Sequence, residues 1–573
     1  CRPRSVRGRP VSAPTTTFVG PSAADVVAAD LLTTGAFLAE VARRYGPAEA
    51  VVLDDALLGG ATVRWTYDDL LARATTVARS LMASGVATGD RVAVLMGNRP
   101  EALAAIFGAG MIGAVAAPVS TFATVPELEQ LLGLCGPRVV LTQSMLLGRR
   151  PGDDVAAVAD SVPSLVRTAV LGTDGWDDFL ADGAVVDDDE LQRRGDAVRP
   201  SDPALVVLSS GTTAAPKGVL HTHRAPTLQF WVQARVFGRN SSTRMFSALP
   251  IFWTAGLNTA VGSTLAAGGC WVAQETFEAR TALALLERER VTEPYTLPHQ
   301  TAALAEQPEW LETDLSSVRC AYGKGAYARH PTVRPDPGWI MPVGYGLSET
   351  CAFVAGYCSD ESRDQMKVGN GRLLPGTQLR VVEPTTGELL GPGSEGELAV
   401  AGETLMIGYL GRDPADCVDR DGFFHTGDLG HVDGDGIVHF TGRRTELIRT
   451  GGANVSPAEV EVALRAFGPV KLSRVIGIPD ERLDEVVVAC VVVRDGARTS
   501  EQEVKDFLRG RVAPYKVPRH VVLLGADEVP MTAGGTKVRD DDLRPLVLRR
   551  LAEAAGPTNL STVPHADRPE ERQ

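Results

Sequence analysis

Near its N-terminus the chain alternates amphipathic segments with short apolar runs, and this alternation constrains the fold most. The apolar residues between Leu70 and Met82 recur on one face of a helix. A second helix is predicted to begin at Pro100 and to end near Gly113. Apolar strands are predicted between and after these helices, at residues 92–96 and 115–119. Strands that alternate with helices predict a parallel sheet with helices on both faces.

The length of 573 residues predicts several structural units, since a typical domain holds about 150 residues. Short strands between Gly, Pro and Asp turns predict a β subdomain at residues 377–445. We therefore expect an α/β fold with two domains. A large N-terminal domain (26–445) would hold two α/β subdomains plus the β subdomain, and a small α+β domain (446–550) would follow. The polar ends, 1–25 and 551–573, are predicted to be disordered.

Composition excludes several classes of protein. The net charge of −14 argues against a nucleic-acid groove, which needs a basic surface. The eight cysteines are scattered without a C-x-x-C pair, a pattern typical of small buried side chains in a reducing cytoplasm. No apolar run follows the basic N-terminal residues, and the most apolar stretch, Ile106–Val119, is too short to span a bilayer. The sequence predicts a cytoplasmic protein without a membrane span.

One loop is rich in groups that bind phosphate. LSSGTTAAPKGVLHTH, Leu208–His223, places glycines, hydroxyls and a lysine between two apolar runs, which predicts a strand, a loop and then a second apolar segment. Backbone N–H groups and hydroxyls donate to the oxygens of a polyphosphate, and a lysine supplies positive charge. The loop is not a Walker loop, because Pro216 precedes Lys217 and Gly218 follows it. Taken alone, it is equally well interpreted as a surface loop without a ligand.

Further segments carry clustered polar residues, and each has an ordinary interpretation by itself. Glu349 fits the start of a helix, Asp428 a turn, and Lys537 an exposed lysine. The segments are GYGLSET at 344–350, FFHTGDLGHVDGDGIVHFTGRRTE at 423–446, TGGANVSPAEVE at 450–461 and PMTAGGTKVRD at 530–540. Together and in this order, they strongly resemble the adenylate-forming superfamily of acyl-CoA synthetases, adenylation domains and luciferases. The resemblance covers roughly Trp65 to Arg544.

This resemblance implies an acid–CoA ligase with two half-reactions. A small-molecule carboxylic acid attacks the α-phosphate of ATP, giving acyl-AMP and pyrophosphate, and the thiol of coenzyme A then attacks the acyl-AMP. It also implies Mg²⁺ as a cofactor, bound by Glu349, and a C-terminal lid domain hinged at Glu446. A homodimer is left open.

Site residues follow from the resemblance, position by position. Lys537, Glu349 and Thr212 match catalytic positions, with Lys537 as the cation that bridges acyl and phosphate oxygens. Asp428 matches the carboxylate that accepts from the ribose hydroxyls, and Arg443 would lie against ribose and phosphate. The other nucleotide-binding positions are Ser209, Ser210, Gly211, Thr213, Lys217, Gly325, Ala326, Tyr345, Gly346 and Ser348. Gly451 and Gly452 match the path of the pantetheine arm of CoA.

The acid pocket of the superfamily maps onto seven residues. They are Trp253, Gly256, Tyr322, Gly323, Gly344, Cys351 and Ala352. The three glycines are expected to leave room, and no charged side chain is evident. We therefore expect an apolar carboxylic acid, aliphatic, alicyclic or aromatic, rather than an amino acid, whose ammonium would need a buried carboxylate. Trp253 is either a gate of this pocket or a plain core aromatic.

The sequence departs from the superfamily pattern at several positions. One residue is inserted before Lys537, which would displace its ammonium by about 3 Å. Lys324 and Tyr327 place bulky side chains at the adenine strand, and Ala214 replaces a loop glycine. These departures leave two alternatives to the full ligase: an enzyme that only converts preformed acyl-AMP to acyl-CoA, and one that loads a carrier protein. A nucleotide sensor without turnover is disfavoured, because binding alone needs no lysine on a mobile lid.

Overall fold

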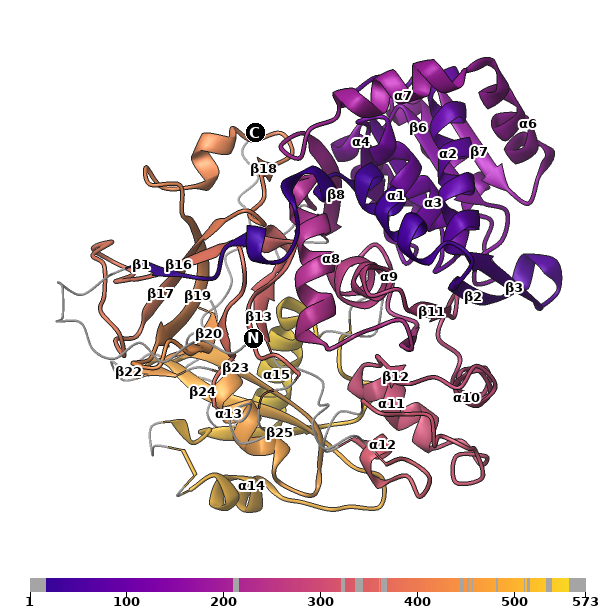
Figure 1. Cartoon of the computed structure of the whole chain (residues 1–573). Coiled ribbons are helices and arrows are strands. Elements are labelled where there is room, and N and C mark those ends of the chain that lie inside the picture. The colour runs from indigo at the N-terminus through magenta and orange to yellow at the C-terminus, as the bar shows by residue number, and fades with distance from the viewer. Residues whose placement is uncertain are drawn as a thin grey trace, which may run out of the picture. The chain divides into compact units, whose positions relative to one another are not determined.

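The structure is a computed structural model. It describes residues 17–209, 216–320, 325–334, 344–359, 361, 368–443, 448–450, 453–455, 457–480, 483–509, 511–512, 516–531 and 538–555. The chain divides into two compact units (Figure 1). The first unit is Cys1–Thr426 with His431–His439, and the second is Gly427–Gly430 with Phe440–Gln573.

A seven-stranded sheet organises the first unit, in the order β18-β9-β8-β5-β4-β6-β7. Its strands are β4 (Arg91–Leu95), β5 (Val115–Pro118), β6 (Val139–Gln143), β7 (Arg167–Leu171), β8 (Pro203–Ser209), β9 (Lys217–Thr222) and β18 (Gly408–Tyr409). Strands β4 to β8 pair in parallel, as the alternating pattern predicts. Strands β9 and β18 pair antiparallel, because β9 returns beside β8 as a hairpin and β18 adds to its outer edge.

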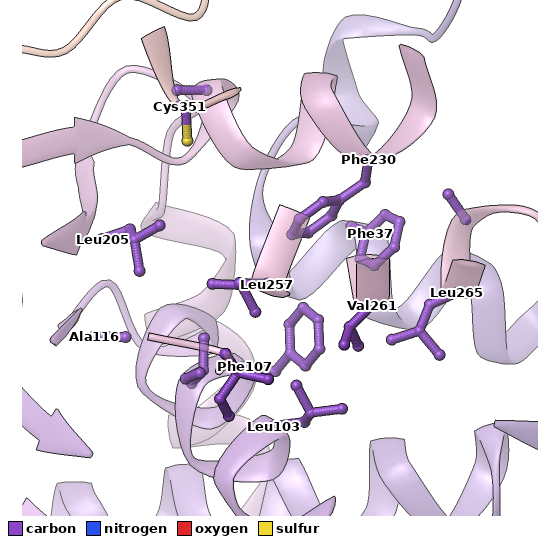
Figure 2. Close-up of a cluster of buried hydrophobic side chains, with 14 of the residues drawn as sticks. Phe37, Leu103, Phe107, Ala116, Leu205, Phe230, Leu257, Val261, Leu265 and Cys351 are labelled. Atoms are coloured by element: carbon purple, nitrogen blue, oxygen red, sulfur yellow. The ribbon is translucent and has the colours of Figure 1, made fainter. Parts of the chain in front are cut away.

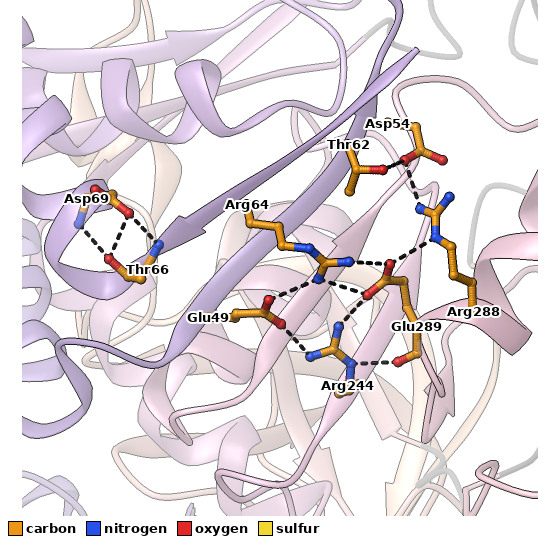
Figure 3. Close-up of polar contacts among 9 residues, drawn as sticks. All are labelled: Glu49, Asp54, Thr62, Arg64, Thr66, Asp69, Arg244, Arg288 and Glu289. Atoms are coloured by element: carbon orange, nitrogen blue, oxygen red, sulfur yellow. Dashed lines mark hydrogen bonds and ion pairs between the residues drawn. The ribbon is translucent and has the colours of Figure 1, made fainter.

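The connections of this sheet are mostly helical. They include α2 (Tyr67–Ala83), α3 (Pro100–Met111), α4 (Val125–Cys135), α5 (Pro151–Val158), α6 (Asp174–Asp182) and α7 (Asp188–Ala197). Helix α2 begins after Thr66 because Thr66 and Asp69 form a capping box. Each of the two side chains accepts a hydrogen bond from the backbone N–H of the other residue (Figure 3). Such a cap stabilises a helix by about 1 kcal/mol.

A second sheet of the first unit has the order β12-β10-β11-β2-β3. Its strands are β2 (Glu49–Asp55), β3 (Ala61–Thr66), β10 (Arg244–Ser247), β11 (Cys270–Ala273) and β12 (Glu293–Pro294). The associated helices are α1 (Thr34–Tyr45), α8 (Arg224–Val236), a π-helix (Ala255–Gly262), α9 (Ser263–Ala266), α10 (Ala279–Arg288), α11 (Pro298–Ala305) and α12 (Ala326–Arg329). Only β3 pairs antiparallel, so this sheet is again of the α/β kind.

Two further sheets are antiparallel. One has the order β13-β14-β15, with β13 (Gly344–Leu347), β14 (Ala352–Gly356) and β15 (Arg372–Leu373). The other has the order β1-β16-β17-β19-β20, with β1 (Thr17–Val19), β16 (Thr377–Val382), β17 (Gly396–Gly402), β19 (Phe424–Val432) and β20 (Val438–Arg443). The prediction of disorder through residue 25 is wrong for residues 17–25, because Thr17–Val19 pair with β16 and a short 3-10 helix follows at Ala23–Asp25.

The second unit is α+β, as predicted. Its sheet has the order β22-β21-β24-β23, and β25 pairs with β24. The strands are β21 (Ile448–Thr450), β22 (Ala453–Val455), β23 (Val470–Asp480), β24 (Asp484–Val493) and β25 (His520–Leu524), and the helices are α13 (Pro457–Arg465), α14 (Glu501–Leu508) and α15 (Asp540–Ala555). Residues 551–555 therefore belong to a helix and not to the predicted disordered tail.

The main core of the first unit surrounds three stacked helices. Phe37 of α1 packs on Phe107 of α3 and on Phe230 of α8, with ring centroids 6.0 and 4.9 Å apart (Figure 2). Leu257 and Val261 of the π-helix belong to the same buried cluster. Burying each such side chain contributes about 1.5–3 kcal/mol. The core therefore fixes the π-helix, which follows the predicted pocket residue Trp253. No helix of the described residues is long and apolar enough to cross a membrane.

An ion network joins the strands of the second sheet (Figure 3). Arg64 of β3 and Arg244 of β10 each bridge Glu49 and Glu289, with N–O distances of 2.7–2.9 Å. The Glu289 side chain is buried, and burial raises its pKa. The hydrogen bonds and charges of Arg64, Arg288 and Arg244 outweigh this effect and hold the pKa below the usual value. The network fixes the register of β2, β3 and β10 at one edge of the first unit.

Candidate active site

The phosphate-loop prediction rests on strands that the structure describes. β8 and β9 form an antiparallel hairpin in which Ser209 pairs with Lys217, so the predicted strand is β8 and the second apolar segment is the strand β9. Residues 210–215 connect the two strands and lie outside the described residues. Four predicted site residues fall in this range: Ser210, Gly211, Thr212 and Thr213. Lys217 begins β9 and is half-buried, so its position is fixed by the hairpin.

A third segment, around β18, completes this part of the site. Ile407 N–H donates to Leu220 O at 2.7 Å, and Leu410 N–H donates to Gly218 O at 2.8 Å. These bonds flank the register pair Tyr409–Val219. Met406 N–H also donates to the backbone oxygen of Glu349 at 2.7 Å. One short strand thus ties the phosphate-loop hairpin to the predicted metal ligand.

Tyr409 contacts both predicted charged residues of this region. Its hydroxyl donates a 2.7 Å hydrogen bond to Glu349 Oε1. Its ring faces the Lys217 ammonium, with Nζ 5.6 Å from the ring centroid. Burial, followed by the neighbouring Glu349 charge, raises the pKa of the Tyr409 hydroxyl above its ordinary value, so the hydroxyl stays protonated and donates. The structure therefore brings Lys217 and Glu349 to opposite parts of one side chain.

The Glu349 carboxylate has the chemistry that Mg²⁺ needs. It is half-buried, and among the described residues no group of three or more His, Cys, Asp or Glu side chains forms a metal site. A single carboxylate does not build an all-protein cage. It does suit Mg²⁺, which usually keeps several waters and is held by one or two carboxylates plus substrate phosphates. The residues present thus fit a metal that arrives with a nucleotide.

The neighbouring residues of the GYGLSET segment are held by the same hairpin. His221 Nε2 donates to Ser348 O at 2.8 Å from β9. Burial lowers the pKa of His221 to about 4, so the imidazole is neutral at physiological pH. Tyr345 is buried, and a Cβ on Gly346 would lie 2.0 Å from Ala352 O, so only glycine fits there. Tyr345 and Gly346 thus lie in β13, and Ser348 begins the short 3-10 helix that carries Glu349.

The adenine strand differs from expectation at Tyr327. Gly325 is the N-cap of α12, and Ala326 is its first residue, half-buried. Tyr327 was expected to border the nucleotide. Instead it is 2% exposed and packs on Trp310, with ring centroids 5.6 Å apart. Tyr327 is therefore a core residue of α12. Lys324 lies outside the described residues.

In the second unit, Asp428 and Arg443 lie together. Asp428 Oδ1 is 2.9 Å from Arg443 Nε. The aspartate side chain is only 4% exposed, whereas that of the arginine is 50% exposed. A buried carboxylate beside a half-exposed guanidinium keeps acceptor capacity for neighbouring hydroxyls, because a carboxylate has about four lone-pair sites.

The described side chains of the predicted acid pocket lie in two places: Cys351 and Ala352 beside the π-helix, and Trp253 in a group of aromatic rings. Asn258 of the π-helix donates through Nδ2 to the backbone oxygen and to Sγ of Cys351, which joins the segments around 256 and 351. Cys351 is buried, and burial raises the pKa of its thiol to about 12, so it stays neutral. Trp253 is half-buried and packs against Phe122 and Phe252 as a group of three rings. Ala352 is buried beside Cys351.

The expected room beside Gly256 and Gly344 is filled by backbone. A Cβ on Gly256 would lie 2.0 Å from Pro250 O, and one on Gly344 would lie 2.7 Å from Ala355 O. These glycines allow close approach of two backbone segments, and the explanation that they enlarge the pocket is wrong. Tyr322, Gly323, Glu446, Gly451, Gly452 and Lys537 lie outside the described residues.

Comparison with known proteins decides the family. Residues 38–410 match the model of the AMP-binding enzymes, and residues 459–536 match the model of their C-terminal domain. The chain belongs to the AMP-binding enzymes. This AMP-binding enzyme is 34% identical over 495 residues to an indoleacetate–CoA ligase of Aromatoleum aromaticum, covering 85% of this chain and 94% of the relative. It is 35% identical over 478 residues to a feruloyl-CoA synthase of Amycolatopsis, covering 82% and 91%.

The solved structures agree with this assignment. ATP-bound MatB from Rhodopseudomonas palustris superposes on the AMP-binding enzyme with a TM-score of 0.71 and 28% identity, covering 90% of this chain and 99% of that one. The predicted superfamily is thus confirmed, and so is the predicted α/β architecture with a large N-terminal and a small C-terminal domain.

Three residues of this AMP-binding enzyme's site were missed by the sequence reasoning. They are Tyr409, His221 and Asn258. His221 stands inside the phosphate-loop segment, but no residue pattern there indicates its contact with Ser348. Tyr409 lies in β18, a strand of two residues, and no residue pattern joins it to position 349. Only the pairing of β18 with β9 reveals the connection.

Proposed function

We propose that this AMP-binding enzyme is an AMP-forming acid–CoA ligase for an aromatic carboxylic acid without a second charged group. The observation that supports it most directly is the arrangement of Lys217 and Glu349 at the end of the phosphate-loop hairpin. Transfer of AMP to an acid releases pyrophosphate, and the departing charge needs a cation and a metal. Lys217 supplies the cation, and Glu349 is the carboxylate suited to Mg²⁺.

In the first half-reaction, a carboxylate oxygen of the acid attacks the α-phosphorus of ATP. The bond from that phosphorus to the bridging oxygen of pyrophosphate breaks, and acyl-AMP forms. Lys217 and the loop before it hold the departing pyrophosphate end, and Asp428 accepts from the ribose hydroxyls. A Mg²⁺ ion at Glu349 would supply further positive charge to the phosphates. Lys537 is assigned to the acyl and α-phosphate oxygens from the resemblance.

In the second half-reaction, the sulfur of CoA attacks the carbonyl carbon of acyl-AMP. The carbon–oxygen bond to AMP breaks, the thioester forms, and the thiol proton passes to solvent. Gly451 and Gly452 are assigned to the passage of the pantetheine arm. The C-terminal domain, from residue 446 onward, is inferred to act as a lid that serves both half-reactions.

The aromatic acid is inferred from the described part of the predicted pocket. Trp253, with Phe122 and Phe252, offers ring faces, and aromatic pairs contribute beyond their buried area. Cys351 and Ala352 are uncharged and buried. The names of two relatives, an indoleacetate–CoA ligase and a feruloyl-CoA synthase, also refer to aromatic acids.

A panel of acids tests this function. Indoleacetate, ferulate, octanoate, malonate and phenylalanine are each incubated with the full chain, ATP and Mg²⁺, with and without CoA, while pyrophosphate and thioester are measured. We expect pyrophosphate and thioester with the aromatic acids above all. Thioester from synthetic acyl-AMP, without pyrophosphate from any free acid, would indicate an enzyme of the second half-reaction alone. Acyl transfer to a pantetheinylated carrier protein in preference to CoA would indicate a loading enzyme.

A further inference from the structure

We propose that Tyr409 is a positioning residue of the nucleotide site, which holds Lys217 and Glu349 apart so that both meet ATP and its metal ion unpaired. The inference rests on the proposed function, because it takes Lys217 as the phosphate cation and Glu349 as the metal ligand. Neither the superfamily resemblance nor the phosphate-loop pattern points to this tyrosine, which lies 192 positions after Lys217 and 60 after Glu349.

The strand pairing explains how Tyr409 reaches Lys217. Tyr409 is paired with Val219, and Lys217 lies two residues before Val219 in β9. Residues two apart on a strand share a face, so Lys217 is the diagonal neighbour of Tyr409. Diagonal neighbours are within reach when one is aromatic and the other long. The 5.6 Å separation between Nζ and the ring centroid lies within the range of a cation–π contact.

The backbone likewise fixes Glu349 next to Tyr409. Met406 N–H donates to Glu349 O, and His221 Nε2 donates to Ser348 O. The glutamate backbone is thus tied both to the segment of Tyr409 and to the strand of Lys217. With the backbone fixed, the 2.7 Å bond from the tyrosine hydroxyl selects one orientation of the Glu349 carboxylate. This orientation leaves Oε2 for other ligands.

The charges show what the tyrosine prevents. Within the described part of the chain, no carboxylate lies within 4.0 Å of Lys217 Nζ, and Glu349 forms no ion pair. Opposite charges anchored on adjacent segments attract each other, and a direct lysine–glutamate pair would neutralise the cation for phosphate and the anion for the metal. Tyr409 satisfies each group with an uncharged partner. The Tyr409 ring also contacts Arg412, whose Cζ lies 5.5 Å from the ring centroid and which adds positive charge beside the ring.

Binding of ATP tests the proposal without turnover. Isothermal titration calorimetry gives the Kd of ATP for the full chain with Mg²⁺ and with EDTA. Tyr409→Phe removes only the hydroxyl, and we expect the Kd with Mg²⁺ to rise about tenfold, since a hydrogen bond to a charged group contributes roughly this factor. The effect with EDTA should be smaller, because Glu349 contacts the nucleotide through the metal. Tyr409→Leu also removes the ring, and we expect a larger loss that persists with EDTA.

A double-mutant cycle separates positioning from a structural role. In the Glu349→Gln background, Tyr409→Phe should change the Kd less than about twofold, since the charged partner is gone. An equal rise in both backgrounds would overturn the proposal, as would an unchanged Kd in the single variant. Tyr67→Phe is the matched control, because it removes a hydroxyl that donates to Gly269 O in the core. It should lower the melting temperature and leave the Kd unchanged.

The outcome is separable from that of the proposed function. If wild-type protein binds ATP but releases pyrophosphate with no acid, the ligase function fails, while the Kd comparison still decides the role of Tyr409. If Tyr409→Phe lowers the melting temperature as much as Tyr67→Phe while its Kd for ATP is unchanged, the tyrosine is structural and the positioning role fails alone. A Kd for ATP with EDTA that is lower in Tyr409→Trp than in Tyr409→Leu would support the ring contact to Lys217.

Discussion

Arg443 Nε lies 2.9 Å from Asp428 Oδ1, and the two side chains differ sharply in exposure. Asp428 is 4% exposed, and Arg443 is half-exposed. The aspartate is therefore a fixed acceptor, and the arginine is a partner that can shift toward another anion. This asymmetry suits a site in which Asp428 binds ribose hydroxyls and Arg443 contacts the phosphate, the roles that the superfamily resemblance assigns to them.

Asp428→Asn keeps the shape of the side chain and removes its charge. We expect kcat/KM for ATP to fall about 10- to 100-fold, because a hydrogen bond to a charged acceptor contributes about 1.5–3 kcal/mol. KM for the acid should stay within about twofold. Steady-state pyrophosphate release with varied ATP measures the change. Asp421→Asn is the control, since Asp421 is exposed, pairs with Arg380 and has no predicted role in nucleotide binding. Equal effects of the two changes would contradict the ribose role.

The fully buried ion pair of Arg239 and Glu293 anchors the π-helix. Arg239 Nε lies 2.9 Å from Glu293 Oε2, and its Nη1 donates to Thr259 O within the π-helix and to Ser263 Oγ at the start of α9. Glu293→Gln leaves the guanidinium without its counter-charge. We expect the free energy of unfolding of the first unit to fall by about 3–5 kcal/mol. Urea unfolding followed by tryptophan fluorescence reports this unit, because all seven tryptophans lie between residues 65 and 339.

An exposed pair provides the comparison for this change. Arg150 and Asp153 are 3.8 Å apart, and both side chains are more than 70% exposed. Asp153→Asn should alter the unfolding midpoint only slightly, since exposed ion pairs contribute about 0–1 kcal/mol. A loss for Glu293→Gln no greater than that for Asp153→Asn would show that the buried pair does not hold the π-helix.

Local patterns predicted the fold well where neighbours in sequence decide the structure. The helical face between Leu70 and Met82 is α2, and the apolar run that ends at Leu208 is the predicted strand, β8. The failures involve residues that meet across long distances. The two-residue strand β18 exists only because β9 offers it an edge, and the terminal strand β1 exists only beside β16. Periodicity cannot appear in so few residues, so Tyr409 and the ordered residues 17–25 were missed.

Two buried histidines predict a loss of stability in mild acid. Burial lowers the pKa of both His221 and His223 to about 4, against about 6.5 in an unfolded chain. As the pH falls from 7 to 5, the unfolded chain binds a proton at each histidine and the folded chain does not. The folded state therefore loses about 2 kcal/mol for each of them in this window.

Substitution of one histidine should reduce this pH dependence. Gln places an amide nitrogen where His221 Nε2 donates to Ser348 O, and it does not titrate. Urea unfolding of His221→Gln at pH 7 and pH 5 should show a drop in unfolding free energy that is about 2 kcal/mol smaller than in the wild type. His223→Asn should act similarly, because its amide oxygen can accept from Thr34 N–H in place of Nδ1. An unchanged pH dependence in both variants would mean that these imidazoles are protonated inside the fold.

Gly256 and Gly133 respond in opposite directions to the same added methyl group. A Cβ at Gly256 would lie 2.0 Å from Pro250 O, so Gly256→Ala must push the π-helix away from the turn before Trp253. We expect a loss of about 1–3 kcal/mol in unfolding free energy and a raised KM for the acid. Gly133 in α4 has nothing within 4 Å of its Cβ position, so Gly133→Ala should stabilise the protein by about 0.5–1 kcal/mol. Gly256→Ala could instead leave the unfolding free energy unchanged and alter only the range of acids accepted. That result would show that Gly256 lines the pocket and that its contact with Pro250 does not require glycine.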